Sequence, residues 1–262
     1  MIDLSEPIVM GILNCTPDSF FAGSRMQTER EIARRAQQIV DEGGRIIDVG
    51  AFSTRPGADM VTEEDEMQRL ENALRIVRRE CPHVIVSVDT YRPLVARRCV
   101  EEWGAHIVND VGGISGIEEC GKRNEMFATI ARLRVPYIYM SSQATIKQML
   151  QSWKEDIALL RSMGVNDIIL DPGFGFGKTV EENYAVMRDL DELQQLELPL
   201  LVGVSRKSMI WKVLGGTADT ALNGTTALHA IALMKGANIL RVHDVKEAVE
   251  TVSIMEKLKV KN

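Results

Sequence analysis

The chain has 262 residues, of which 45% are hydrophobic and 26% are charged, and its formal net charge is −6. This is the composition of an ordinary soluble protein with enough length for one large core. The acidic balance argues against general binding to nucleic acids or anionic membranes, but it leaves room for a local basic pocket.

The cysteines and the N-terminus indicate a reducing compartment. Four cysteines in this length, Cys15, Cys81, Cys99 and Cys120, show no paired metal-ligand spacing and do not suggest a disulfide scaffold. Residues 1–6 lack a basic segment followed by an apolar run, and no apolar run approaches transmembrane length. We therefore expect a cytoplasmic protein with neither a membrane nor a nucleic-acid partner.

Short apolar runs alternate with helical patterns along the whole chain. We predict eight strands, at residues 7–13, 45–52, 84–90, 106–111, 136–141, 167–171, 199–205 and 239–243. We predict helices at residues 29–42, 62–80, 93–103, 118–134, 145–163, 179–196, 207–214, 220–236 and 245–259. Strict alternation predicts a parallel sheet, and eight units in this length favour one closed (β/α)8 TIM barrel over residues 1–262 rather than an open doubly wound sheet.

The segment Asp171–Lys178, which reads Asp-Pro-Gly-Phe-Gly-Phe-Gly-Lys, follows the sixth predicted strand. Pro172 cannot donate to a strand ladder, so a carboxylate stands at the strand's end, and the alternating glycines permit a tight turn. The segment misses a phosphate-binding P-loop because Pro172 occupies the place of the first glycine, and Lys178 breaks the dinucleotide fingerprint. A plain glycine-rich turn between strand and helix remains open at this point.

Polar residues stand at nearly every predicted strand end, where a TIM barrel carries its chemistry. One group could hydrogen-bond a flat heterocycle: Asp89, Asn109, Asp171 and Lys207. A second group suits a polyanion: Asn14, Arg55, Arg241 and His243, in which the amide oxygen of Asn14 can also ligate Mg²⁺. His243 alternates with Arg241 along one strand, so both side chains should face the same way.

Simpler structural roles compete at several of these positions. Asp89 could cap the helix that follows it, and Asn109 with Asp110 could form a turn. Residues 205–207 could be a solvated helix start, although two cations at a helix N-terminus are unfavourable without a nearby anion. One of Phe174 and Phe176 could stack on a ring, or both could be core packing.

Seven segments, in this order, resemble the dihydropteroate synthase family along almost the whole chain: residues 10–20, 53–58, 87–90, 108–110, 171–179, 203–208 and 241–244. The resemblance implies a TIM-barrel transferase of folate synthesis. Such an enzyme joins 6-hydroxymethyl-7,8-dihydropterin pyrophosphate to p-aminobenzoate and releases pyrophosphate and 7,8-dihydropteroate. The resemblance further implies Mg²⁺ as cofactor, a homodimer, and sulfonamides as inhibitors.

The resemblance also assigns roles to individual residues. The implied pterin pocket is Asp89, Asn109, Asp171 and Lys207, with Met140 able to pack on the pterin. The implied pyrophosphate and metal site is Asn14, Arg55, Arg241 and His243, with Asn14 as the metal ligand. The implied p-aminobenzoate contacts are Thr54, Pro56, Phe176, Lys207 and Ser208. Asp89, Asp171, Lys207, Arg241 and His243 are the expected catalytic residues, and segments 15–27 and 53–61 the expected mobile loops.

The chain departs from the family pattern at a few positions. Ser141 stands where the family commonly has a histidine after the fifth strand, and Ala144 stands where it has glycine. Phe21 and Ala22 replace a more usual Ser-Asp in the first loop. None of these changes removes an expected catalytic residue.

Two other functions compete with the synthase. A methyltransferase or corrinoid-protein domain that binds methyl-tetrahydrofolate in a similar barrel would not need residues 53–58 or 205–208, which are present. An inactive homologue should have lost some of the expected ligands, and all are retained. For the synthase, an electron-rich pterin and a weak arylamine nucleophile predict that pyrophosphate leaves before the amine attacks.

Overall fold

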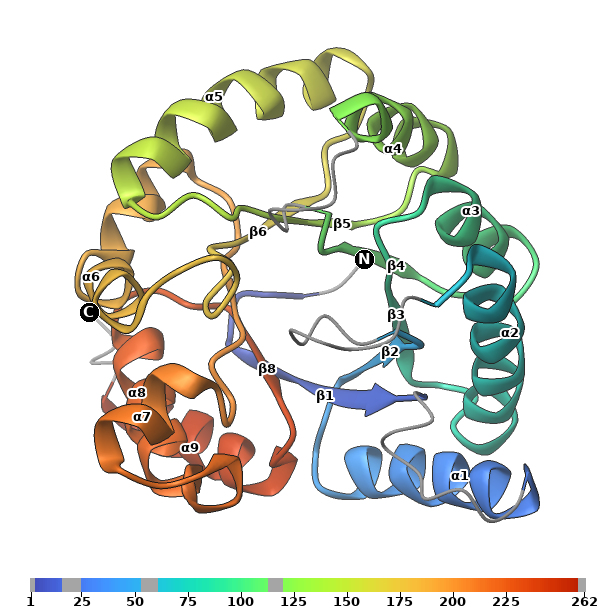
Figure 1. The fold of residues 1–262 in the computed structure, drawn as a ribbon, viewed down its shortest axis with the longest axis horizontal. Helices are drawn as coiled ribbons and strands as arrows, with labels where there is room; N and C mark the ends of the chain where they lie inside the picture. The colour runs from blue at the N-terminus through green and yellow to red at the C-terminus, as the bar shows by residue number, and fades with distance from the viewer. Residues whose placement is uncertain (1–2, 16–24, 53–60, 113–119, 259–262) are drawn as a thin grey trace.

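The predicted strands form one parallel sheet that curls into a barrel in the computed structural model of the protein (Figure 1). The structure describes residues 3–15, 25–52, 61–112 and 120–258. The strands are β1 (Ile8–Asn14), β2 (Ile46–Gly50), β3 (Ile85–Asp89), β4 (Ile107–Asp110), β5 (Tyr137–Met140), β6 (Ile168–Asp171), β7 (Leu201–Val202) and β8 (Ile239–Val242). Their order is β6-β5-β4-β3-β2-β1-β8-β7, and a parallel bridge from Leu170 to Leu200 links β6 to the residue before β7. The predicted TIM-barrel fold is confirmed.

Helices surround the barrel on its outer side (Figure 1). They are α1 (Arg25–Asp41), α2 (Glu63–Glu80), α3 (Pro93–Glu101), α4 (Cys120–Leu133), α5 (Ile146–Ser162), α6 (Val180–Arg188), α7 (Ser208–Leu214), α8 (Leu222–Met234) and α9 (Val245–Leu258), with 3-10 helices η2 (Leu190–Leu196) and η3 (Ala218–Thr220). Among the described residues, no helix is long and apolar enough to cross a membrane.

Two predicted elements differ from the structure. The helix predicted at 179–196 ends at Arg188 and continues as η2, in which Leu190 and Leu193 are both fully buried. The 3-10 geometry explains this arrangement, because it brings residues three apart to the same face. The strand predicted at 199–205 is reduced to the two residues of β7, because the chain then turns into a loop where Arg206 has a φ of 55°.

The helix start predicted at Thr62 is confirmed, since the Thr62 hydroxyl accepts a hydrogen bond of 3.1 Å from the Asp65 amide. Thr179 begins α6 with a reciprocal capping box, in which its hydroxyl and the Glu182 carboxylate each accept an amide hydrogen bond. These caps satisfy amides that the first helical turn leaves without partners. They fix where α2 and α6 leave the loops that follow β2 and β6.

The interior of the barrel is built in two layers. The lower layer is an apolar cluster with one residue from each of seven strands: Met10, Ile46, Ile107, Ile138, Ile169, Leu201 and Ile239. Two positions further along their strands, the same inward-facing rows carry Asp48, Asn109, Met140, Asp171 and Arg241. Side chains two apart share a face of a strand, so this pattern stacks a mostly polar layer on an apolar floor.

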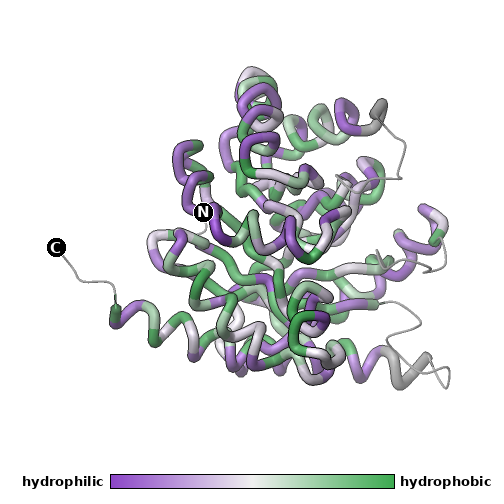
Figure 2. Tube along the Cα trace, turned by 60° about the vertical axis from the view of Figure 1, so that its left-hand side comes forward, coloured by the Kyte–Doolittle hydropathy of each residue, from purple (hydrophilic) through white to green (hydrophobic). Residues whose placement is uncertain are grey.

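A larger apolar core lies between the strands and the helices. In the hydropathy view, the strands are mainly hydrophobic and the helices alternate between hydrophobic and hydrophilic residues (Figure 2). Trp153 of α5 and Tyr137 of β5 are among the largest fully buried side chains there. This packing holds the strands in the register that sets the position of the polar layer above the floor.

A buried ionic contact joins α2 to the end of β3. The fully buried Glu66 accepts hydrogen bonds from the Thr90 hydroxyl at 2.6 Å and from the Arg92 guanidinium. Arg92 also donates to the carbonyl of Val61 at 2.8 Å, so it ties down the residue that leads into α2. Burial raises the pKa of Glu66, and the hydrogen bond from Thr90 and the charge of Arg92 oppose that rise.

We expect Glu66→Gln to lower the free energy of unfolding by about 3 kcal/mol or more, because it leaves the buried cation of Arg92 without its counter-charge. Urea denaturation followed by circular dichroism measures this change. Glu102→Gln is the matched control, since Glu102 forms a solvent-exposed pair with Arg98 and should leave the urea midpoint unchanged. Equal midpoints for the two variants would contradict a structural role for the Glu66 charge.

Candidate active site

Arg241 bridges two carboxylates at the mouth of the barrel. Its Nε donates to Asp48 and its Nη2 to Asp89, each at 2.6 Å. Asp48 is fully buried on β2, and the same oxygen accepts a second hydrogen bond of 3.0 Å from the Asn109 amide. Burial would lower the pKa of Arg241, but the two carboxylates outweigh it and raise this pKa above its ordinary value. The guanidinium is therefore a fixed cation whose Nη1 stays free of the described residues.

Four buried polar atoms around this cation have no hydrogen-bond partner among the described residues. They are Asp48 Oδ1, Ser87 Oγ, Asp89 Oδ1 and Asn109 Oδ1. Buried polar atoms are rarely left without a partner, because desolvation without compensation is costly. An array of carboxylate and amide oxygens with one hydroxyl suits a ligand whose edge presents several N–H donors.

Asp171 at the end of β6 and Lys207 in the loop after β7 lie close enough for their charges to interact. Burial lowers the pKa of Lys207 to about 8, while the charge of Asp171 opposes the shift. The Lys207 ammonium donates to the Phe174 carbonyl and lies 4.4 Å from the centre of the Phe176 ring. Burial also raises the pKa of Asp171, whose Oδ1 accepts from the Gly173 amide at 2.8 Å. Lys207 therefore interacts with both the carboxylate of Asp171 and the aromatic ring of Phe176.

The glycine-rich loop after β6 closes tightly onto the end of β5. Gly173 has a φ of 65°, and a methyl group on it would lie 2.2 Å from the carbonyl oxygen of Ser141. Only glycine allows this backbone approach, as the sequence predicted. Lys178 holds the loop by donating to the Gly173 carbonyl at 2.9 Å, and burial lowers its pKa to about 8. Ser141 is buried and accepts from the Gln143 amide, so it serves the turn.

Asn14 ends β1 beside Asp89. A methyl group on Gly50 would lie 3.4 Å from Asn14 Oδ1 and 3.6 Å from Asp89 Oδ2, so both oxygens adjoin one point of the mouth. Among the described residues, no group of three or more His, Cys, Asp or Glu side chains could hold a metal ion. Mg²⁺ is commonly bound through one or two protein oxygens together with water and substrate phosphates. The single amide oxygen of Asn14 fits such a shared ion.

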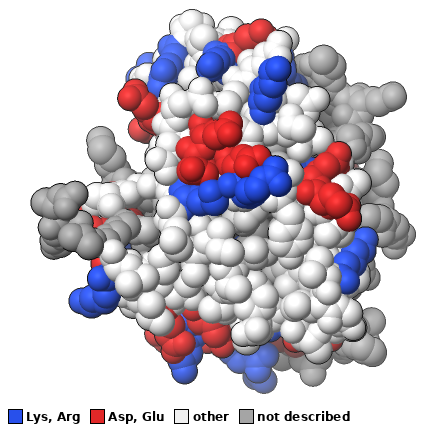
Figure 3. All heavy atoms as spheres, turned by 90° about the vertical axis from the view of Figure 1, so that its left-hand side faces the viewer, with Lys and Arg blue, Asp and Glu red and all other residues white. Residues whose placement is uncertain are grey.

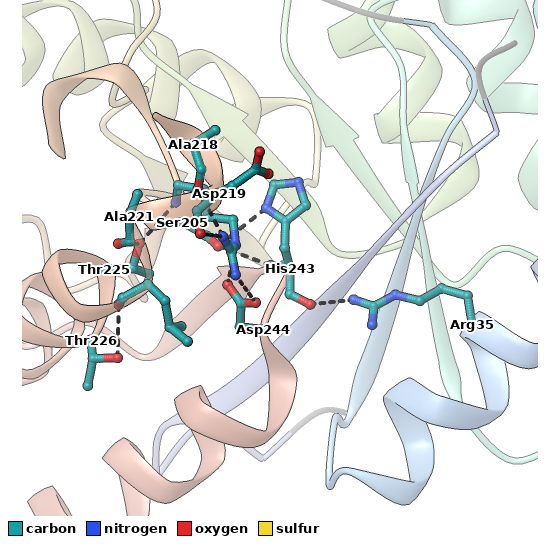
Figure 4. A network of polar contacts seen from close by, with 11 residues as sticks. Arg35, Ser205, Ala218, Asp219, Ala221, Thr225, Thr226, His243 and Asp244 are labelled. Carbon is teal, nitrogen blue, oxygen red and sulfur yellow. Dashed lines mark hydrogen bonds and ion pairs between the residues drawn. The ribbon is translucent and has the colours of Figure 1, made fainter. Parts of the chain in front are cut away.

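His243 lies at the end of β8, with its ring next to Ser205 (Figure 4). Its Nδ1 is 3.3 Å from Ser205 Oγ, and its backbone amide donates to the same oxygen at 3.1 Å. Burial lowers the pKa of His243 to about 4, and the neighbouring charge of Arg241 adds to this effect. The imidazole is therefore neutral at neutral pH, and it adjoins the fixed cation as the alternation along β8 predicted.

The structure brings most of the predicted site residues together. Asn14, Asp89, Asn109, Met140, Asp171, Phe176, Lys207, Arg241 and His243 all stand at the C-terminal ends of the strands or in the loops directly after them, and Ser208 is the first residue of α7. Thr54, Arg55 and Pro56 lie outside the described residues, as do Phe21 and Ala22. Their roles stay predictions.

The structure also decides between the simpler alternatives. Asp89 does not cap α3, whose N-cap residue is Arg92. In the Asn109–Asp110 pair, Asp110 makes the turn by accepting from the Gly112 amide at 2.7 Å, while Asn109 faces the interior. Phe174 is fully buried core packing, and the half-buried Phe176 is the ring that contacts Lys207.

Sequence reasoning missed Asp48, Lys178 and Ser205. The available signal for Asp48 was an isolated carboxylate within the apolar strand Ile46–Gly50, two positions after a floor residue. A charged residue inside an otherwise buried strand needs a partner. Because side chains two positions apart share a face, the partner of Asp48 had to lie on the same inner side of the barrel as Ile46. Lys178 was noted in the failed nucleotide motif and within the family-like segment 171–179, but without a role of its own.

Residues 10–243 match the family model described as a pterin binding enzyme. With the strand-end carboxylates, amide and cations of the parallel barrel, this match defines the chain as a pterin-binding barrel enzyme. It is 40% identical to the dihydropteroate synthase of Escherichia coli K12, over 97% of this chain and 93% of that one.

Solved structures agree with the sequence comparison. The crystal structure of a Clostridium difficile dihydropteroate synthase in the presence of pteroic acid has a TM-score of 0.91 and 34% identity, and it covers 100% of both chains. The Yersinia pestis dihydropteroate synthase in a complex with a sulfonamide drug has a TM-score of 0.86 and 36% identity, covering 98% of this chain and 96% of that one. The chain belongs to the dihydropteroate synthase family, which are transferases of folate synthesis.

The lowered pKa of Lys207 generates a pH prediction. As the pH rises through about 8, the ammonium loses its proton, and kcat/KM for the pterin substrate should fall because a charged donor is lost. Lys207→Arg should flatten this alkaline limb, since a guanidinium stays charged over the range. Lys178→Arg is the control, because Lys178 also titrates near 8 but bonds only to loop carbonyls. Loss of the limb in the control alone would assign it to Lys178.

Proposed function

We propose that this chain condenses 6-hydroxymethyl-7,8-dihydropterin pyrophosphate with p-aminobenzoate, giving 7,8-dihydropteroate and pyrophosphate. The observation that carries the pterin assignment is the set of buried oxygens above the apolar floor, near Lys207 and Asp171, that have no partner within the part of the chain the structure describes. A pterin ring is flat and has amino and ring N–H donors on one edge and a carbonyl acceptor on the other. Carboxylates and the Asn109 amide would meet the donors, while Lys207 would donate to the carbonyl.

The second substrate is assigned to the outer side of Lys207. Pteroic acid, present with the Clostridium difficile enzyme, contains both a pterin and a p-aminobenzoate unit, and a sulfonamide drug binds the Yersinia pestis enzyme. Phe176 offers a half-buried ring and Ser208 a hydroxyl at the start of α7. Thr54 and Pro56 are proposed to complete this subsite, and sulfonamides are proposed as its inhibitors.

The departing pyrophosphate is assigned to the cationic side of the mouth. Arg241 Nη1 makes no hydrogen bond with the described residues, and the neutral imidazole of His243 can donate one hydrogen bond to an oxygen of the leaving group. Arg55 is proposed as a further cation. Asn14 would hold Mg²⁺ through its amide oxygen, and the ion when bound would neutralise negative charge on the phosphates.

The mechanism proposed is dissociative. The electron-rich pterin ring can share the positive charge that develops as the C–O bond breaks, so the residues need mainly to bind the departing anion. No described side chain is placed as a general base for the arylamine other than Lys207, which is mostly charged below its pKa of about 8. The loss of pyrophosphate would therefore precede attack by the amine nitrogen, which then releases its proton.

We further propose that the chain is a single domain that forms a homodimer. Exposed apolar side chains gather on the three C-terminal helices, with Val213 and Leu214 on α7, Ile231 and Met234 on α8, and Ile254 and Leu258 on α9. The face in Figure 3 carries a broad area without charged side chains. A second copy is the favoured occupant, because apolar patches of this kind mark association surfaces.

The cytoplasm is the proposed compartment. Cys15, Cys81 and Cys99 are buried free thiols, and burial raises the pKa of Cys15 to about 12. A thiol held protonated in this way resists oxidation, and reduced cysteines are usual in a cytoplasmic enzyme.

We expect Asp171→Asn to weaken binding of unactivated 6-hydroxymethyl-7,8-dihydropterin by about tenfold or more, since a hydrogen bond to a charged group is worth roughly 1.5–3 kcal/mol. Calorimetry measures this affinity without turnover. Asp110→Asn is the matched control, because Asp110 also ends a strand of the barrel, β4, but bonds to Tyr137 and Gly112. Unchanged affinity in Asp171→Asn would remove this residue from the pterin pocket.

The order of bond breaking can be tested directly. Given the pterin pyrophosphate and Mg²⁺ without p-aminobenzoate, the enzyme should slowly release pyrophosphate above the enzyme-free rate. Chelation of Mg²⁺ should stop turnover in the complete reaction. A concerted displacement predicts no release until the amine is added, and activity in excess chelator would refute the proposed cofactor. A coupled pyrophosphate assay follows each arm.

A further inference from the structure

Two consecutive residues after β7 pair with two consecutive residues after β8. Ser205 contacts His243 (Figure 4). Arg206 forms a two-bond ion pair with Asp244, with both N–O distances at 2.8 Å. Ser205 is only 5% exposed, so its hydroxyl must find its partners within the protein. The first pair lies directly beside the proposed pyrophosphate site.

The hydrogen-bonding capacity of Ser205 fixes the direction of this contact. Its oxygen already accepts the backbone amide of His243 at 3.1 Å. The hydroxyl proton needs an acceptor, and among the described residues His243 Nδ1, at 3.3 Å, is the one within reach. A hydroxyl that donates to Nδ1 requires this nitrogen to be unprotonated. The single N–H of a neutral imidazole then sits on Nε2.

The surrounding contacts hold both members of the pair in place. Arg206 has a left-handed backbone with a φ of 55°, which is costly for a residue with a side chain. Its amide donates to Thr225 Oγ1 at 3.0 Å, and its guanidinium is clamped by Asp244. On the other side, Arg35 donates to the His243 carbonyl at 2.6 Å (Figure 4). These contacts therefore fix the backbone next to Ser205 and the backbone at His243.

We propose that Ser205 is a positioning residue that holds His243 as the Nε2–H tautomer, so that the imidazole presents a hydrogen-bond donor to the anionic leaving group. The alternative tautomer would direct a lone pair at this anion and repel it. The inference rests on the proposed role of His243 at the pyrophosphate. It adds the residue that determines which ring nitrogen of His243 carries the proton. The Arg206–Asp244 clamp keeps Ser205 within reach.

Histidine tautomers can be read by NMR without any assay of activity. A ¹⁵N-labelled wild-type sample at neutral pH should show the Nε2–H tautomer for His243, assigned with a His243→Gln variant. Ser205→Ala should convert this signal to a mixture of tautomers. It should also lower kcat by about three- to tenfold, as expected for the loss of one hydrogen bond, with the KM for p-aminobenzoate nearly unchanged.

Thr225→Val is the matched control, because it removes another buried hydroxyl that anchors the same loop but does not touch His243. It should leave the tautomer of His243 as in the wild type. Three results would overturn the inference: a wild-type ring that is charged or protonated on Nδ1, a Ser205→Ala variant with unchanged tautomer or unchanged kcat, or an equal tautomer change in Thr225→Val. A wild-type chain that forms no dihydropteroate would instead refute the proposed function, and the tautomer would still be measured.

Discussion

The site depends on one buried electrostatic constraint, the bridge that Arg241 forms between Asp48 and Asp89. A carboxylate within a barrel interior is unstable without a partner, because its desolvation is not repaid. The guanidinium supplies this partner, and in turn it loses the freedom to move. Asn109 is oriented by the same carboxylate, because its Nδ2 donates to Asp48, while its Oδ1 has no hydrogen-bond partner among the described residues. One network of ion pairs and hydrogen bonds therefore fixes the positions of several groups that would hydrogen-bond the pterin.

This network resolves an apparent contradiction between charge and function. The chain has a net charge of −6, yet it is expected to bind a pyrophosphate. The carboxylates around Arg241 are paired or buried, and burial raises the pKa of both Asp89 and Asp171. What the leaving group would meet is the outer edge of the guanidinium and the neutral ring of His243. Net charge describes long-range attraction, whereas the site is governed by contacts within a few ångströms.

Much of the fold was predictable because its signals are local. Apolar runs and capping residues such as Thr62 and Thr179 mark strands and helix starts within a few positions. The strand after Pro199 was predicted too long, since its end is set by pairing with β8 and by the left-handed turn at Arg206. The helix after Thr179 was also predicted too long, because periodicity does not distinguish an α-helix from the 3-10 turn in which Leu190 and Leu193 are buried.

Reading the amino-acid sequence was enough to predict the barrel, the polar strand ends and the family, because periodicity and ordered motifs are local features of the chain. Sequence reasoning also separated a heterocycle group from a polyanion group. The folded structure was needed to show that Arg241, of the polyanion group, also contacts Asp89 of the heterocycle group. It was also needed to show that Asp48 pairs with Arg241 and Asn109, and that Ser205 contacts His243. Asp48 and Arg241 are far apart in the chain, and Ser205 and His243 come from different strand ends. Their meeting depends on the register and tilt of strands closed into a barrel, which no local pattern specifies.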